Sequence, residues 1–89
     1  MSIRGGLLYK NRCADGRLNL CGARVAALRK GMRPAVSQRA LADRLQLRGV
    51  DLDKNAVQRI ESGQRFVTDI ELKALAAVFG VSADELLNG

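Results

Sequence analysis

The sequence predicts an all-α fold, a compact five-helix bundle over residues 20–89. Apolar residues recur at the three- and four-residue spacing of helices, and Asn, Ser, Asp or Thr residues that cap helices stand before these stripes. The alternation of apolar and polar residues that is typical of strands is absent from this part of the sequence. A chain of 89 residues has room for one domain with one modest core.

The first two expected helices lie on either side of a loop that contains Pro34, which keeps them separate. Asn19 is a good N-cap for the first helix, which ends near Gly31. Its apolar stripe consists of Cys21, Val25, Leu28 and Met32. Ser37 can cap the second helix, residues 38–46. Its inward positions are Leu41, Ala42 and Leu45, and its outward positions are Arg39, Asp43 and Arg44.

Three further helices follow, each opened by a capping residue. Asp53 caps a helix over residues 54–62, which Gly63 stops. Thr68, with Glu71 three positions later, is a capping box for the fourth helix. The core stripe of that helix is Leu72, Leu75, Ala76 and Phe79. Ser82 and Glu85 repeat the capping pattern for a last short helix that carries Leu86 and Leu87.

Charge is unevenly distributed along the sequence, whose formal net charge is +6. Residues 1–50 hold eleven Lys or Arg and two Asp, whereas residues 51–89 hold four Lys or Arg and seven acidic residues. A surface with one basic side suits an anionic partner such as nucleic acid. The alternative is that these charges only keep the helices soluble.

Several classes of protein do not fit this sequence. No apolar run approaches the roughly 20 residues that a membrane-spanning helix needs, and the first residues lack the apolar core of a signal peptide. We therefore expect a soluble, cytoplasmic protein with no membrane partner. There is no His, no glycine-rich phosphate cradle before a helix, and no Ser near a plausible base. We expect no enzymatic activity and no cofactor.

The two cysteines, Cys13 and Cys21, fall short of the four ligands of a structural zinc site unless two chains share one ion. Cys21 lies on the apolar stripe of the first helix, where a thiol is an ordinary small core residue. We therefore predict no metal site. Cys13 is less determined, and a redox-sensing pair of thiols stays a minor alternative.

The helix over residues 54–62 has a narrow apolar side and a wide polar side. At about 100° per residue, Ala56, Val57 and Ile60 share the apolar side. The polar arc holds Lys54, Asn55, Gln58, Arg59 and Ser62, with no acidic residue. Asn and Gln can pair bidentately with adenine, and Arg and Lys with guanine. The alternative is a plain solvated face, although such faces use Glu and Lys more freely.

Four segments carry a family resemblance by their order and spacing: CGARVAALRK, VSQRALADRL, NAVQRIESGQR and LKALAAVFGVSADELL. Together they resemble the helix-turn-helix domains of the phage Cro and C1 repressor type, also called Xre-like. The resemblance covers residues 20–89 and leaves residues 1–19 as a separate N-terminal arm. It implies a lambda-repressor-like bundle in which the second and third helices form the helix-turn-helix unit, with the third as recognition helix in the major groove. Ala42 matches the small residue at the helix crossing, and Val57 matches a buried β-branched position.

The resemblance also implies roles for individual residues. The positions that read bases, or that reach a base or phosphate at the groove edge, are Lys54, Asn55, Gln58 and Arg59. The phosphate contacts are Gln38, Arg39, Arg44 and Arg65. Within the second group, Gln38 also matches a residue that braces the recognition helix, whereas Arg39 and Arg44 are added from their charge and exposure. Arg29 and Glu61 match an internal ion pair between the first and third helices.

Two connections depart from the family pattern, residues 46–52 and the slightly long loop GMRPAV between the first two helices. Residues 46–52, QLRGVDL, make a longer connection than the family's tight turn, so we expect the recognition helix to be displaced or tilted. Arg48 and Gly49 in this loop either add a phosphate contact or have no specific role.

The arm of residues 1–19 is basic and contains ADGR, a plausible turn. Contact with DNA, a hairpin packed through Leu7, Leu8 and Tyr9, and disorder are the open alternatives for it.

The leading hypothesis is a sequence-specific regulator of transcription that binds double-stranded DNA, as a repressor of a phage-like element, a mobile element or its own operon. One helix reads few bases, so we expect a homodimer on a palindromic operator. The residues available for dimer contacts are Ile70, Ala74, Ala77, Val78, Leu86 and Leu87. A protein-interaction module, such as the antitoxin of a toxin–antitoxin pair with a protein partner, is the main alternative. A thiol sensor that uses Cys13 is a third.

Overall fold

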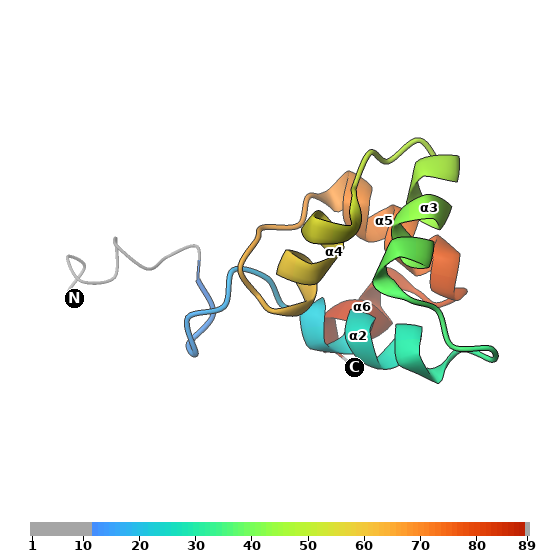
Figure 1. The fold of residues 1–89 in the computed structure, drawn as a ribbon. Coiled ribbons are helices and arrows are strands. Elements are labelled where there is room, and N and C mark those ends of the chain that lie inside the picture. The colour runs from blue at the N-terminus through green and yellow to red at the C-terminus, as the bar shows by residue number, and fades with distance from the viewer. Residues whose placement is uncertain (1–11, 89) are drawn as a thin grey trace, which may run out of the picture.

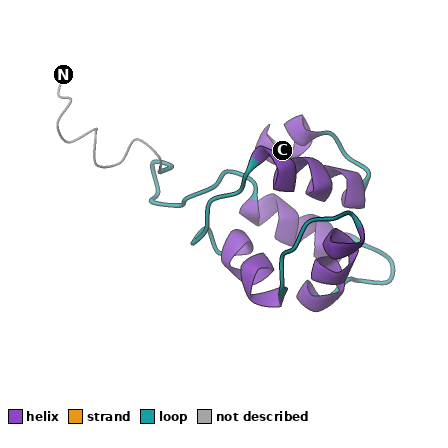
Figure 2. Ribbon diagram, turned by 90° about the horizontal axis from the view of Figure 1, so that it is seen from above, coloured by secondary structure: helices purple, strands orange, loops and turns teal. Residues whose placement is uncertain are grey.

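The described part of the chain folds into five helices joined by short loops. A computed structural model describes residues 12–88, and no strand occurs in this part of the chain (Figure 2). The helices are α2 (Gly22–Gly31), α3 (Gln38–Leu47), α4 (Lys54–Glu61), α5 (Asp69–Phe79) and α6 (Ala83–Asn88). In Figure 1, α4 lies in the middle of the bundle, with α2 below it and α3 beside it. The predicted all-α, five-helix bundle is confirmed. Within the described residues, no helix has both the length and the apolar character that crossing a membrane requires.

Four helices begin directly after the residues that the sequence predicts as caps, whereas α2 begins after Cys21, which makes no side-chain cap bond, and not after the predicted cap Asn19. Ser37, Asp53 and Ser82 each accept a hydrogen bond from the backbone N–H three positions later. Thr68 and Glu71 form the predicted capping box of α5, in which each side chain accepts from the backbone of the other residue. These bonds pair backbone donors that the first turn of a helix leaves free.

The core is formed by apolar side chains from all five helices. The largest fully buried side chains are Val25, Leu41, Leu45, Val57, Ile60, Leu75, Leu86 and Cys21. Helix α4 packs against both α2 and α3, whereas α5 contacts α2, α3 and α6. Ala74 and Leu86, two of the residues considered for dimer contacts, belong to this core and are unavailable to a partner.

Backbone hydrogen bonds and two buried side chains fix the connection between α3 and α4. Gly49 has a φ of 81°, a left-handed conformation that favours glycine. Its N–H donates to the carbonyl of Gln46, and the N–H of Val50 donates back to the last turn of α3, which completes a Schellman motif. Val50 and Leu52 are both buried against the core. The longer connection is therefore an ordered part of the bundle.

Helices α2 and α4 approach each other closely at Gly22. A Cβ atom at this position would lie 2.1 Å from the carbonyl oxygen of Ile60. Asn19 joins the two helices at this point. Its Oδ1 accepts from the N–H of Gly22 at 2.8 Å, and its Nδ2 donates to the carbonyl of Ile60 at 3.0 Å. Asn19, two positions before the N-cap Cys21, thus links the first N–H of α2 to the last turn of α4.

We expect Gly22→Ala to destabilise the fold by about 2 kcal/mol or more, because the added Cβ pushes α2 away from α4. Gly31→Ala is the matched control, since a Cβ at the other end of α2 meets nothing within 4 Å. That variant should be neutral, or more stable by up to about 1 kcal/mol. Urea unfolding measures both, and equal stabilities would contradict the close approach.

Candidate nucleic-acid interface

Helix α4 buries its apolar side and exposes its polar side. Ala56, Val57 and Ile60 are in the core. The exposed residues of this helix and its C-cap include the whole predicted polar arc, Lys54, Asn55, Gln58, Arg59 and Ser62. The helix therefore packs through its narrow side and presents a wide face of amide, hydroxyl and cationic groups.

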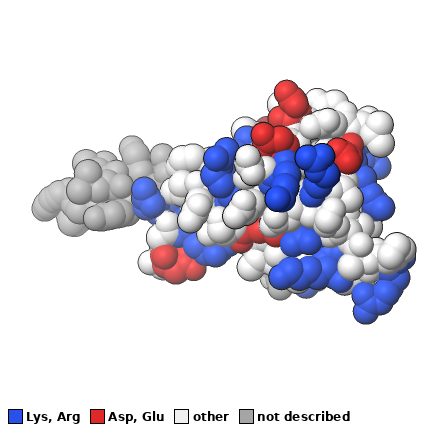
Figure 3. Space-filling model, in the orientation of Figure 1, with Lys and Arg blue, Asp and Glu red and all other residues white. Residues whose placement is uncertain are grey.

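The first turn of α3 lies next to this helix and favours anions. It contains no acidic residue, and the partial positive charge of a helix N-terminus attracts phosphate. The side chains of Arg39 and Arg44 are both exposed. Figure 3, in the orientation of Figure 1, shows Lys and Arg side chains in several groups on this side of the molecule, with acidic groups at its upper edge, near its centre and at its lower left.

Glu61, at the end of α4, receives side chains from two other helices. Arg29 of α2 donates from Nε to Oε2 at 2.7 Å and from Nη2 to Oε1 at 2.9 Å, which makes a bidentate ion pair. Gln38 of α3 donates from Nε2 to Oε1 at 3.0 Å. Both charged side chains are largely buried, with 11% and 8% of their surface exposed. The structure therefore brings together three residues that the sequence singled out, although Gln38 meets Glu61 and not α4's outer face.

The electrostatics of this cluster favour ionised Glu61. Burial raises the pKa of its carboxyl, but the hydrogen bonds from Arg29 and Gln38 and the charges of Arg29 and Lys30 outweigh burial and lower it. The hydrogen bond to Glu61 raises the pKa of Arg29. Arg29 also donates from Nη1 to the carbonyl of Val36 at 2.9 Å, which ties the loop before α3 to the same cluster.

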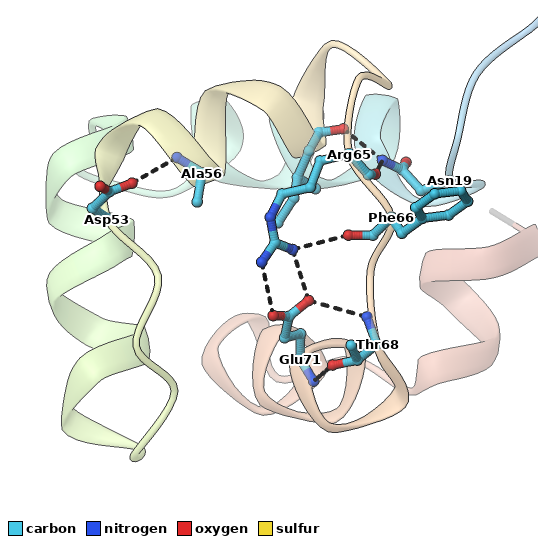
Figure 4. Close-up of polar contacts among 8 residues, drawn as sticks. Asn19, Asp53, Ala56, Arg65, Phe66, Thr68 and Glu71 are labelled. Carbon is cyan, nitrogen blue, oxygen red and sulfur yellow. Dashed lines mark hydrogen bonds and ion pairs between the residues drawn. The ribbon is translucent and has the colours of Figure 1, made fainter.

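Arg65 lies in an internal ion pair that the sequence analysis did not anticipate (Figure 4). Its Nη1 and Nη2 donate to the two carboxylate oxygens of Glu71, at 2.8 and 3.1 Å. Nη1 also donates to the carbonyl of Phe66 at 2.9 Å. The hydrogen bonds from Arg65 lower the pKa of Glu71, and the same contact raises the pKa of Arg65. Most of the donors with which Arg65 was expected to bind a phosphate are therefore already used within the fold.

The described part of the N-terminal arm is ordered against the bundle. The predicted turn is present: the N–H of Cys13 donates to the carbonyl of Arg17, and the N–H of Arg17 donates to Asp15 Oδ1. Arg17 then reaches the end of α4, a contact for which its position in a basic turn gave no signal. The expected contacts of Leu7, Leu8 and Tyr9 lie outside the described residues.

The two cysteines are free thiols in the structure. Cys21 is buried, as predicted, and burial raises the pKa of its thiol. The thiol of Cys13 donates to the carbonyl of Asn19 at 3.4 Å. Among residues 12–88, no three His, Cys, Asp or Glu side chains gather in a way that could hold a metal ion.

Comparison with protein families agrees with this arrangement. The family described as "Helix-turn-helix domain" matches residues 21–88. The chain belongs to the helix-turn-helix domain family. Helices α3 and α4 are joined by one loop and pack against each other, as the two helices of a helix-turn-helix unit do. A search of curated proteins and a search of solved structures each found no match to this chain.

We expect the cluster around Glu61 to make the free energy of unfolding of this helix-turn-helix domain depend on pH. Because the pKa of folded Glu61 lies below the ordinary value of 4.5, the ionised carboxylate stabilises the fold above that pH. This stabilisation is lost as the pH falls through the folded-state pKa. At neutral pH, Glu61→Gln should cost about 3 kcal/mol, the scale for breaking a buried ion pair.

Urea unfolding at neutral pH and below pH 4.5 measures this effect. The variant should lose less stability in acid than the wild type does. Glu85→Gln is the control, because its carboxylate is exposed and lies 4.0 Å from Arg24. A pair of this kind contributes about 0–1 kcal/mol. If both variants showed the wild-type acid dependence, the assignment to Glu61 would be wrong.

Proposed function

We propose that this protein is a sequence-specific transcription regulator of the Cro/C1 type, or Xre-like, that binds double-stranded DNA. The observation that carries the proposal is the outer face of α4, where every residue of the polar arc is exposed and none is acidic. This face belongs to a helix-turn-helix domain and is held in place by packing against α2 and α3. Such a helix can lie in the major groove and meet base edges.

In this proposal, Lys54, Asn55 and Gln58 read bases. Their amide and ammonium groups offer the donors and acceptors that distinguish base pairs in the major groove. Arg59, one position further around the exposed face, reaches a base or a phosphate at the groove edge. The N-cap Asp53 is already paired with the backbone of α4 and orients the first turn of that helix.

Phosphate contacts come from α3. The N-terminal amides and the exposed Arg39 lie at the start of α3, the exposed Arg44 lies in its last turn, and these groups supply affinity that falls with salt. Gln38 keeps both proposed roles, because one amide N–H bonds Glu61 and the amide has a second N–H and an oxygen for a phosphate or water. For Arg65 we revise the proposal: its pairing with Glu71 supports a structural role in place of a phosphate contact.

A homodimer is the assembly that we propose, because one recognition helix reads few bases and a palindrome doubles the contacts. Apolar side chains are exposed around a hollow of about 300 Å³ on the surface near α6. The exposed large apolar residues that line it are Leu20, Phe66 and Leu87. Leu87 was considered from sequence, whereas Leu20 and Phe66 were not. Ile70 is also exposed.

The finer assignments stay predictions. Repression of a phage-like element, a mobile element or the protein's own operon is what the family resemblance implies, and the cytoplasmic location stays an expectation from the sequence. In the antitoxin-like alternative, the main partner is a protein and DNA binding is secondary. The DNA selection described next separates the two.

We expect selection from random duplex DNA to enrich a palindrome with the wild type. Gln58→Ala should lose preference at one position of each half-site, because one good base contact contributes about 1–3 kcal/mol of discrimination. Lys54→Ala should likewise relax the motif. Lys73→Ala is the matched control, since it removes the same charge from an exposed position on α5. Recovery of no motif with the wild type would contradict the proposal and favour the protein-interaction module.

We expect Leu20→Glu to weaken self-association at least tenfold, because it places a charge in the proposed apolar contact. Leu47→Glu is the matched control, since Leu47 on α3 is 88% exposed and lies away from that hollow. Sedimentation equilibrium measures the dissociation constant of each variant. Equal self-association of the two variants would place the dimer contact elsewhere.

A further inference from the structure

Arg17 and Leu18, in the segment before α2, contact the C-terminal end of α4. Arg17 donates from Nη2 to the carbonyl of Glu61 at 2.8 Å. The N–H of Leu18 donates to the carbonyl of Gly63, also at 2.8 Å. The last carbonyls of a helix lack partners within the helix and carry partial negative charge, so a guanidinium at this point is doubly favourable.

Asn19 extends the same set of contacts. Besides its bond to the carbonyl of Ile60, Nδ2 donates to the carbonyl of Arg65 at 2.8 Å. Figure 4 shows Asn19 beside the loop that follows α4. Asn19 is 8% exposed, and it is the one buried polar residue among residues 12–88. Both the last turn of α4 and the loop after it are therefore tied to the residues that precede α2.

The side chain of Arg17 lies directly over Gly63. A Cβ atom on Gly63 would lie 2.8 Å from Cζ and Nε of Arg17. Gly63 also has a φ of 77°, and its N–H donates to the carbonyl of Ile60. The turn that ends α4 thus leaves room for the guanidinium to lie directly on it.

Hydrogen bonds within the N-terminal turn fix the backbone of Arg17. The N–H of Cys13 donates to the carbonyl of Arg17 at 2.8 Å, and the N–H of Gly16 donates to the carbonyl of Cys13 at 2.9 Å. Asp15 accepts from the N–H of Arg17 at 3.1 Å. Arg12, in the same turn, donates to the carbonyl of Gly16 at 3.2 Å, and among residues 12–88 it makes no hydrogen bond to α4.

We propose that residues 12–19 are a clamp that fixes the C-terminal end of α4, with Arg17 as a positioning residue for DNA reading. Helix α4 has eight residues, too few to be stable alone in water, so its orientation depends on what holds its ends. Base contacts require side chains at exact positions, and a shift of the helix end moves Gln58 and Arg59. The DNA part of this inference rests on the proposed function.

The test compares Arg17→Ala with Arg12→Ala, which removes the same charge from the same turn. The first measurement is amide hydrogen exchange of residues 62–64 in the free, full-length protein. Arg17→Ala should accelerate exchange there about tenfold, because a charge-assisted hydrogen bond to the helix end is lost. Arg12→Ala should leave these rates unchanged. Arg17→Lys, which retains a donor and the charge, should restore much of the protection.

The second measurement is the ratio of affinities for the selected palindrome and for a scrambled duplex at the same salt concentration. Arg17→Ala should lower this ratio about tenfold, since each 1.4 kcal/mol is a factor of ten. Arg12→Ala should lower both affinities alike. If Arg17 acted only through its charge, Arg17→Ala and Arg12→Ala would have the same affinity ratio, and this result would overturn the positioning role.

Unchanged exchange at residues 62–64 in Arg17→Ala would overturn the clamp itself. If the wild type selected no palindrome, the proposed function and its DNA-reading extension would both fail, whereas the exchange rates would still decide the clamp.

Discussion

The placement of α4 depends above all on the carboxylate of Glu61. Arg29 from α2 and Gln38 from α3 converge on it, so one side chain joins three helices. Because the charges are largely buried, the loss of either partner would leave the other without compensation. A helix with a narrow apolar side gains little orientation from the core alone. A directional, bidentate contact supplies what a wider apolar face would otherwise provide.

Other contacts fix both ends of α4 without using its outer face. At the start, the Schellman motif at Gly49 and the buried Val50 and Leu52 lead into the Asp53 cap. At the end, the chain continues into Arg65, whose pairing with Glu71 ties the following loop to α5. The side chains of Lys54, Asn55, Gln58 and Arg59 are thereby left exposed, and we infer that this division between buried anchors and an exposed face is what base reading requires.

The helices and their caps could be predicted from sequence because these features depend on residues three or four positions apart. The Arg29–Glu61 contact was expected only through the family resemblance, since nothing local joins residues 32 positions apart. The Arg17 contact spans 44 positions and lies outside the matched family segment, so no pattern indicated it. The pairing of Arg65 with Glu71 was not predicted, because no sequence pattern joins this loop residue to α5. The apolar Val50 and Leu52 did carry a signal that the loop is anchored.

We propose that the outer face of α4 reads DNA while its other contacts hold it rigid. Chemical-shift mapping of the isotope-labelled protein with its selected palindromic duplex is the decisive test. We expect the largest shifts on the side-chain amides of Asn55 and Gln58 and on the backbone amides at the start of α3, with the Arg29–Glu61 cluster preserved. Shifts confined to α5 and α6, or equal shifts with any duplex, would contradict the proposal.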